Sequence, residues 1–224
     1  LWLDPTMNYS SAWFDGHHEQ PMAQGQHAKV KRALQECGVQ RGDAVLEIGC
    51  GWGALAECAA RDFGARVLGV TLSSEQLAWG RARMAQAGLS DQVELRLQDY
   101  RDIPAQRVDA IVSIEMFEAV GREYWGSFFR TVRDRLKPGG RACIQSITIR
   151  DDLFERYANS TDFIQQYIFP GGMLPSVEQF HAQAKQAGLK VVQELRFGPD
   201  YAETLRRWRT RFLAQESQVR QLGF

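Results

Sequence analysis

The 224-residue sequence has no excess charge of either sign, no long apolar run and no closely paired cysteines. It carries 27 Lys and Arg against 27 Asp and Glu, so a formal net charge of zero gives no global attraction to nucleic acid. No stretch approaches the roughly 20 consecutive apolar residues of a membrane span, and the N-terminus does not read as a signal peptide. Any membrane contact is therefore expected to be peripheral.

The cysteines and histidines are also placed without the spacing of a metal site. The four cysteines include no C-x-x-C pair, which excludes a zinc knuckle and a dense disulfide framework. The four histidines lack partners at metal-ligand spacing, so no metal site is predicted. Four cysteines without close pairs fit a protein of the reducing cytoplasm.

The composition is that of a folded domain, with 44% hydrophobic and 24% charged residues. At roughly 150 residues per domain, we expect one main domain over 28–224, preceded by an aromatic, weakly periodic arm or lid over 1–27. The first residue is not Met, and a helical run stops at the last residue. We therefore expect the intact protein to continue beyond both ends.

Strands and helices alternate along the main domain. A helix is expected from about 27 to 37, then a strand and a glycine turn over 41–53, and further strands at 66–72, 93–100, 108–114 and 141–149 with helices between most of them. This order predicts an α/β fold with a mostly parallel, doubly wound sheet covered on both faces. The segment 150–180 interrupts the order and is predicted to be a helical cap. After it we expect a helix over 180–188, a strand over 189–201 and one long helix over 201–222.

A glycine-rich loop directly follows the first strand of this pattern. The run EIGCGWG, with Glu47, Gly49, Cys50, Gly51 and Gly53, combines tight-turning glycines with the free N–H groups of a helix start. A dinucleotide fingerprint would read G-x-G-x-x-G, whereas this loop reads G-x-G-x-G. The spacing favours the S-adenosylmethionine (SAM) methyltransferases.

Polar side chains follow the next strands, where ligands bind in doubly wound folds. The candidates for holding SAM are Thr71, Leu72 and Gln76 after the second strand, Gln98 and Asp99 after the third, and Ser113 and Ile114 at the end of the fourth. The Asp99 carboxylate can accept a hydrogen bond from the adenine amine, and Gln76 can reach the ribose or amino-acid part. The competing interpretation of Asp99 is that it caps a turn.

These motifs together make the sequence resemble the cyclopropane-fatty-acyl-phospholipid and mycolic-acid cyclopropane synthases, which are class I SAM-dependent methyltransferases with a Rossmann-like fold. Six ordered blocks carry the resemblance: YSSAWF from Tyr9, the glycine loop with Trp52, GVTLS from Gly69 with Gln76, SIEMFEAVG from Ser113, FPGG from Phe169 with LPS from Leu174, and YAETL from Tyr201. The resemblance implies that Tyr9 and Ser10 close over SAM, and that Gln98 and Asp99 lie against the adenine.

The family's reaction uses an unsaturated phospholipid acyl chain, which implies peripheral contact with the inner face of the membrane; a homodimer is compatible with it. A cis double bond is a poor nucleophile, so it must be held in line with the SAM methyl in a dry pocket. Attack leaves a carbocation that aromatic faces can stabilise. The candidates, each of which could instead be ordinary core, are Tyr157, Phe163, Tyr167, Phe169 and Trp208.

In the family a bound bicarbonate removes the proton that closes the cyclopropane ring. The resemblance implies that the corresponding positions are Ser11 in place of a Cys, Glu118, Gln145 in place of a His, Ile147 and Tyr201. Because Gln145 cannot become a cation, it would hold an anion less firmly than a protonated His. Bicarbonate binding is therefore left open.

Two products stay open from these residues. Either bicarbonate still binds and the product is a cyclopropane fatty acid, or Glu118 takes the proton itself and the product is a methylene- or methyl-branched chain. A small-molecule C-methyltransferase would share the SAM motifs and differ in the cap. A non-catalytic SAM- or lipid-binding module is a further alternative, against which the presence of Glu118 and Tyr201 argues.

Overall fold

The computed structural model describes residues 2–223, which fall into two compact units. The sheet unit is Leu34–Glu194, and the arm unit joins the residues up to Ala33 with those from Leu195 on. The helix α1 (Met22–Glu36) runs across the boundary in the chain. The observed division thus groups the N-terminal arm with the last helices, whereas sequence analysis ended the arm at residue 27.

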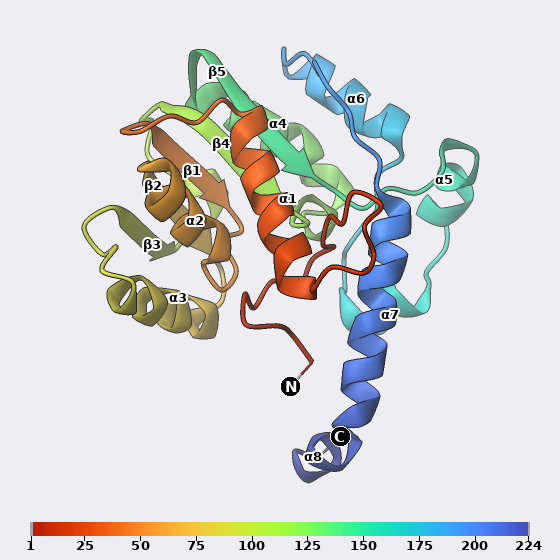
Figure 1. Cartoon of the computed structure of the whole chain (residues 1–224). Coiled ribbons are helices and arrows are strands. Elements are labelled where there is room, and N and C mark those ends of the chain that lie inside the picture. Colours follow the sequence, from red (N-terminus) through yellow and green to blue (C-terminus); the bar gives the residue numbers. More distant parts are fainter. Residues whose placement is uncertain (1, 224) are drawn as a thin grey trace. The chain divides into compact units, whose positions relative to one another are not determined.

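The sheet unit is built on five parallel strands in the order β3-β2-β1-β4-β5. Their bounds are Ala44–Ile48 for β1, Arg66–Thr71 for β2, Val93–Leu97 for β3, Val108–Ile114 for β4 and Leu136–Gln145 for β5. The order reverses between β1 and β4, where ligands bind in doubly wound folds. The structure confirms the predicted parallel α/β sheet (Figure 1).

Helices cover both faces of this sheet. Figure 1 shows α2 (Ala54–Phe63) and α3 (Ser74–Gln86) side by side, and both contact β2 and β3. The opposite face carries Leu46, Ile48 and Val70, which pack in one cluster with α4 (Trp125–Arg135). Alternate residues of each strand thus serve different layers, as the pleat requires.

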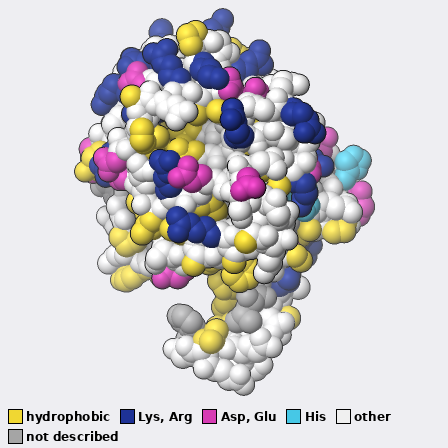
Figure 2. Space-filling view, turned by 90° about the vertical axis from the view of Figure 1, so that its left-hand side faces the viewer, with side chains coloured by type: hydrophobic (Ala, Val, Ile, Leu, Met, Phe, Trp, Pro, Cys, Tyr) yellow, Lys and Arg dark blue, Asp and Glu magenta, His cyan; other side chains and the backbone are white. Residues whose placement is uncertain are grey.

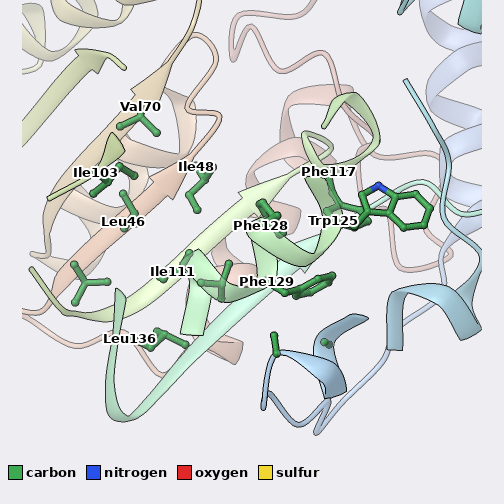
Figure 3. Packing of buried hydrophobic residues seen from close by; sticks show 14 of the residues in the cluster. Leu46, Ile48, Val70, Ile103, Ile111, Phe117, Trp125, Phe128, Phe129 and Leu136 are labelled. Carbon is green, nitrogen blue, oxygen red and sulfur yellow. The ribbon is translucent and has the colours of Figure 1, made fainter. Parts of the chain in front are cut away.

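An aromatic cluster lies beneath the chain that follows β4. Phe117, in the 3₁₀ turn η2 (Phe117–Ala119), is completely buried. Figure 3 shows it beside Trp125 and Phe128, with ring centroids 5.5 and 5.1 Å away. Phe129 lies 5.2 Å from Phe117. These contacts anchor the turn that carries Glu118.

The chain between β5 and the last helices is largely helical. It contains α5 (Asp151–Ala158), a π-helical turn η4 (Ile164–Ile168) and α6 (Val177–Gln186). The Met173 N–H donates to the Glu118 carbonyl oxygen over 2.8 Å. The segment predicted to be a cap is thus hydrogen-bonded to the turn after β4.

The structure corrects four predicted elements. Helix α1 begins at Met22 rather than about 27, because the Pro21 carbonyl accepts from the Gln24 and Gly25 N–H groups and starts the helix. Strand β5 begins at Leu136 rather than 141, directly after α4, with a register irregularity against β4 opposite its glycines.

The other two corrections concern the predicted strand over 189–201 and the helix after it. Residues 189–197 have no regular structure and pair with none of the strands in the described chain, so they lack the ladder that a strand needs. Helix α7 (Gly198–Ala214) starts before the predicted 201 and stops short of 222. The chain breaks at Gln215, and α8 (Glu216–Gln221) follows.

The arm unit is held by polar contacts between residues far apart in sequence. Asp200 in α7 accepts hydrogen bonds from the N–H groups of Phe14 and Asp15 and lies 2.7 Å from His18 Nε2. The Thr204 hydroxyl accepts from the Ala12 N–H. A small apolar cluster of Ala12, Phe14, Met22 and Trp208 accompanies these contacts. The arm is therefore fastened to α7 mainly through its backbone.

The exposed surface has no single-sign character on the face shown in Figure 2, where basic and acidic side chains lie among hydrophobic ones. Within residues 2–223, no helix is long and apolar enough to cross a membrane. The same residues contain no cluster of three or more His, Cys, Asp or Glu side chains arranged to hold a metal ion.

Candidate active site

The glycine loop joins β1 to α2 and is held against β2. The N–H groups of Gly49 and Cys50 both donate to the Val70 carbonyl oxygen, over 3.0 and 2.9 Å. Gly49, Gly51 and Gly53 have φ angles of 84°, 50° and 82°, which only glycine adopts readily. A Cβ on Gly49 would also lie 2.8 Å from Met116 Cγ. The loop therefore needs glycine for its turn and for close packing.

Two further loop residues are buried. Burial raises the pKa of the Cys50 thiol well above its ordinary value, so this side chain fills space rather than acting as a nucleophile. Glu47, on β1 just before the loop, is also buried. A buried carboxylate at this position is compatible with a ligand that carries an amino group.

The polar residues after β2 form a local network. The Thr71 hydroxyl donates to Gln76 Oε1 over 2.9 Å, and the Ser73 side chain caps α3 by accepting from the Gln76 N–H. Leu72, between them, is 75% exposed. The network fixes Gln76 at the start of α3, and Leu72 presents an apolar surface next to it.

The residues after β3 are engaged with their own turn. The Asp99 carboxylate caps η1 (Tyr100–Asp102) and accepts from the Arg101 guanidinium over 2.7 Å. That contact holds the pKa of the Asp99 carboxyl below its usual range. The Gln98 side chain donates to the Asp102 carbonyl oxygen. The contacts of Asp99 are therefore those of a residue that caps a turn.

Ser113 and Ile114 close β4. The Ser113 hydroxyl, fully buried, donates to the Ile48 carbonyl oxygen over 2.9 Å and ties β4 to β1 beneath the glycine loop. Ile114 pairs with Gln145 in the register of β4 and β5. Both residues thus position the strand ends, and any contact of their side chains with SAM stays a prediction.

Glu118 lies in η2, just beyond the end of β4. Its Oε1 accepts a hydrogen bond from the Ile147 N–H. Its Oε2 is shielded from solvent and has no hydrogen-bond partner among residues 2–223. Burial, and secondarily the nearby Glu115 charge, raise the pKa of the Glu118 carboxyl to about 7, although the Ile147 N–H favours the charged form. A carboxyl group with this pKa and a spare oxygen can accept a proton near neutral pH.

Gln145, at the end of β5, is hydrogen-bonded to Glu115 through both its side chain and its backbone. Its Nε2 donates to Glu115 Oε1 over 2.8 Å, and the Glu115 N–H donates to the Gln145 carbonyl oxygen over 2.9 Å. Glu115 has a φ of 46°, in the left-handed region that side chains rarely adopt. The sequence places Glu115 at the end of the fourth strand, within the motif SIEMFEAVG, but neither its backbone angle nor its partner is visible in that motif.

The remaining candidates belong to the arm unit. Tyr9 is about half exposed, whereas Ser10 and Ser11 are buried. The buried Lys29 ammonium donates to the Ser10 hydroxyl over 2.5 Å, and the Ser11 hydroxyl donates to the Ala12 carbonyl oxygen. Tyr201 lies in the first turns of α7. Lys29 was not singled out in the sequence, where it reads as an ordinary helix-surface residue.

The sheet unit fits SAM better than it fits bicarbonate. Its glycine loop opens a helix whose N-cap residue Gly53 supplies no side-chain hydrogen bond, which leaves backbone N–H groups for a ligand. For bicarbonate, two expected donors are already engaged: the Gln145 amide with Glu115 and the Ile147 N–H with Glu118. Bicarbonate binding by these residues stays untested, and an anion here would compete with the Glu115 and Glu118 carboxylates for the two donors.

A family model described as mycolic acid cyclopropane synthetase matches residues 1–223 of this chain. Tuberculostearic acid methyltransferase UfaA1 of Mycobacterium tuberculosis is 43% identical over 99% of this chain and 53% of its own length. The cyclopropane-fatty-acyl-phospholipid synthase of Escherichia coli is 40% identical over 97% of this chain and 54% of its own. The chain thus spans about half the length of these curated relatives.

Solved structures agree with this likeness. The cyclopropane synthase MmaA2 of Mycobacterium tuberculosis superimposes with a TM-score of 0.90 at 29% identity, covering 98% of this chain and 80% of that one. Mycolic acid cyclopropane synthase CmaA1, in a complex with SAH and CTAB, gives 0.88 at 31% identity, covering 96% of this chain and 78% of that one. The Rossmann-like class I methyltransferase fold is therefore established for this chain.

Proposed function

Because the chain belongs to the mycolic acid cyclopropane synthetase family, a family of SAM-dependent methyltransferases, we propose that it transfers a one-carbon group from SAM to the cis double bond of a phospholipid acyl chain. The observation that carries the proposal is Glu118, a buried carboxyl group with a pKa raised to about 7 and with one oxygen that accepts no hydrogen bond from the described residues. Such a group suits a reaction that ends in the loss of a proton.

The residues for SAM are those at the ends of β1 to β4. The glycine loop would hold its amino-acid part, Gln76 its ribose or amino-acid part, and Leu72 its adenine face, with Gln98 and Asp99 beside the adenine. SAM supplies an electrophilic methyl group on a sulfonium, so the acceptor itself need not be a strong nucleophile. Tyr9 and Ser10 of the arm unit are assigned to the same ligand from the family resemblance.

The acceptor carbon must be held in a site free of water, because the alkene is weakly nucleophilic and the cation that it becomes would react with water. The chain after α5 offers aromatic side chains for this purpose. Phe163, Tyr167 and Phe169 are 65%, 64% and 56% exposed, so their faces are available to an apolar ligand. The relatives named as fatty-acyl enzymes support an acyl chain as that ligand.

Glu118 completes the reaction in this proposal. The electron pair of the double bond would form the new C–C bond as the methyl–sulfur bond of SAM breaks and SAH leaves, so a positive charge is left on the neighbouring chain carbon. Glu118 Oε2 accepts a proton from the transferred carbon, and the C–H electron pair either closes a three-membered ring or, after a hydride shift along the chain, forms a C=CH₂ double bond to the chain carbon. The first product is a cyclopropane and the second is a methylene-branched chain.

The cyclopropane is the default product by family, and the branched chain is the second candidate. The engagement of Gln145 with Glu115 favours the second, because it removes a donor that the family's anion site requires. Cytoplasmic location, peripheral contact with the inner face of the membrane and assembly as a homodimer belong to the same proposal.

The test is to incubate the full-length protein with SAM and vesicles of a cis-monounsaturated phospholipid. We expect SAH to form in step with a lipid that has gained one CH₂. Proton NMR then separates upfield cyclopropane signals from olefinic methylene signals. Glu118→Gln should lower kcat by about 10³-fold while SAM still binds. Turnover by Glu118→Gln at the wild-type rate, or methylation confined to soluble acceptors, would contradict the proposal.

A further inference from the structure

We propose that the pair formed by Glu115 and Gln145 closes the ends of β4 and β5 to an external anion, so that the protein removes the proton without bicarbonate. The inference rests on the proposed function and deepens it. It assigns a role to Glu115, and it makes Gln145 a positioning residue rather than an anion ligand.

The contacts of the pair are reciprocal. The Glu115 N–H donates to the Gln145 carbonyl oxygen, and the Gln145 side chain donates back to the Glu115 carboxylate. Two residues beyond the end of β5, the Ile147 N–H donates to Glu118. The Glu115 and Glu118 carboxylates thus accept the hydrogen bonds that the Gln145 side chain and the Ile147 N–H donate. An anion could bind to either donor only by displacing a carboxylate.

The charge of the pair acts in the same direction. Glu115 is close enough to Glu118 for its charge to raise the pKa of the Glu118 carboxyl. A small anion such as bicarbonate would therefore lie beside two acidic side chains, and Gln145 offers no positive charge to offset them. A histidine at position 145 could supply that charge, and glutamine cannot.

The backbone of Glu115 is a third, independent observation. Its φ of 46° is strained for a residue with a side chain, and a glycine would adopt this angle without cost. The strained residue continues directly into Met116 and the buried Phe117, which anchor the turn of Glu118. Position 115 thus carries a glutamate although its backbone conformation would favour glycine.

The experiment compares four forms of the full-length protein: wild type, Glu115→Gln, the double variant Glu115→Gly with Gln145→His, and the control Glu123→Gln, which removes an exposed acid nearby. Each is assayed with SAM and cis-monounsaturated phospholipid vesicles in CO₂-depleted buffer, with and without added bicarbonate. Binding of ¹³C-labelled bicarbonate is measured separately by NMR line broadening, which requires no turnover.

We expect wild type and Glu123→Gln to show no line broadening and a rate that changes by less than about twofold with bicarbonate. The double variant should bind bicarbonate, respond to it by about tenfold in kcat with little change in KM, and give more cyclopropane. Glu115→Gln keeps the side-chain length and loses the charge, so its rate should respond to bicarbonate less than that of the double variant. It provides the comparison with wild type if the double variant fails to fold.

Saturable bicarbonate binding or a tenfold bicarbonate response in wild type would overturn the inference, as would variants indistinguishable from wild type in both measurements. A failure of the proposed function looks different: no form methylates the lipid at any bicarbonate level. The NMR measurement then still decides whether Glu115 and Gln145 exclude the anion.

Discussion

The sheet unit and the arm unit are stabilised by different kinds of contact. In the sheet unit the strands and α4 bury a continuous set of aliphatic and aromatic side chains, with Phe117 at its centre. In the arm unit the few buried apolar residues are accompanied by backbone N–H groups that donate to Asp200 and Thr204, more than 180 residues away in sequence. Apolar burial is tolerant of small shifts, whereas each buried hydrogen bond depends on one partner.

This difference predicts where a substitution acts most strongly. Phe117→Ala should cost the sheet unit about 4 kcal/mol of unfolding free energy, because it leaves a cavity among four aromatic rings. Urea unfolding followed by circular dichroism would measure it. Phe117→Leu, which keeps most of the volume, should cost clearly less; equal losses would mean that packing around this ring is loose.

Asp200→Ala is the corresponding break in the arm unit. It leaves the Phe14 and Asp15 N–H groups and His18 without their acceptor, for an expected cost of roughly 3 kcal/mol. The loss should be local, so limited proteolysis should cut within residues 1–21 while the sheet unit stays folded. Asp15→Asn is the control, because it keeps the backbone donor and suits the left-handed φ of 52° at this position. An unchanged cleavage pattern in Asp200→Ala would show that apolar contacts alone hold the arm.

The pH dependence of stability offers a sharper test in the sheet unit. The pKa of Glu118 is raised from 4.5 to about 7 in the folded protein, so the folded state binds the proton more tightly than the unfolded state. The stabilisation from this group is complete below pH 4.5 and is lost as the pH rises to 7, by about 3 kcal/mol in total.

Glu118→Gln removes this titration. The stability of the variant relative to wild type should therefore grow between pH 4.5 and 7 and then stay constant. Parallel pH profiles of wild type and variant, measured by chemical unfolding, would mean that the carboxyl group is not desolvated as described. Glu123→Gln, at an exposed acid, should leave the profile unchanged.

The smallest expected effect is at Thr204. Thr204→Val keeps the shape of the side chain and removes the hydroxyl that accepts from the Ala12 N–H and donates to the Asp200 carbonyl oxygen. We expect a loss of about 1 kcal/mol, measured by urea unfolding. Thr204→Ser, which retains the hydroxyl, should restore most of it. A loss as large as that of Asp200→Ala would show that the two residues act as one unit.

The difference between apolar packing in the sheet unit and single hydrogen bonds in the arm unit also explains which parts of the fold the sequence could predict. The strands and helices from residue 44 to 135 follow from apolar periodicity and turn residues, and the glycine loop follows from its spacing. The contacts of Asp200 with the arm have no period, so the grouping of the arm with α7 could not be predicted. The predicted strand over 189–201 failed for a related reason, because periodicity does not tell whether a partner strand is present.

The candidate site was predicted in the same uneven way. Glu118 and Ile147 were found by resemblance, and the structure joins them by a hydrogen bond. The contact between Gln145 and Glu115 could not be foreseen, since it depends on a left-handed backbone angle after β4. The contact of the Asp99 carboxylate with Arg101 was likewise not visible in the motif, and the contact of Asp99 with the adenine stays a prediction. Side-chain partners of this kind are decided by geometry rather than by motif.

The most direct test of the central claim uses SAM with a fully deuterated methyl group and cis-monounsaturated phospholipid vesicles. If a carbon of the acyl chain accepts the methyl group and Glu118 then takes a proton from it, the lipid product retains two of the three deuterium atoms on the new carbon, and Glu118→Gln gives almost none of that product. A product that keeps all three deuterium atoms on a heteroatom, or the absence of any labelled acyl chain, would contradict the account.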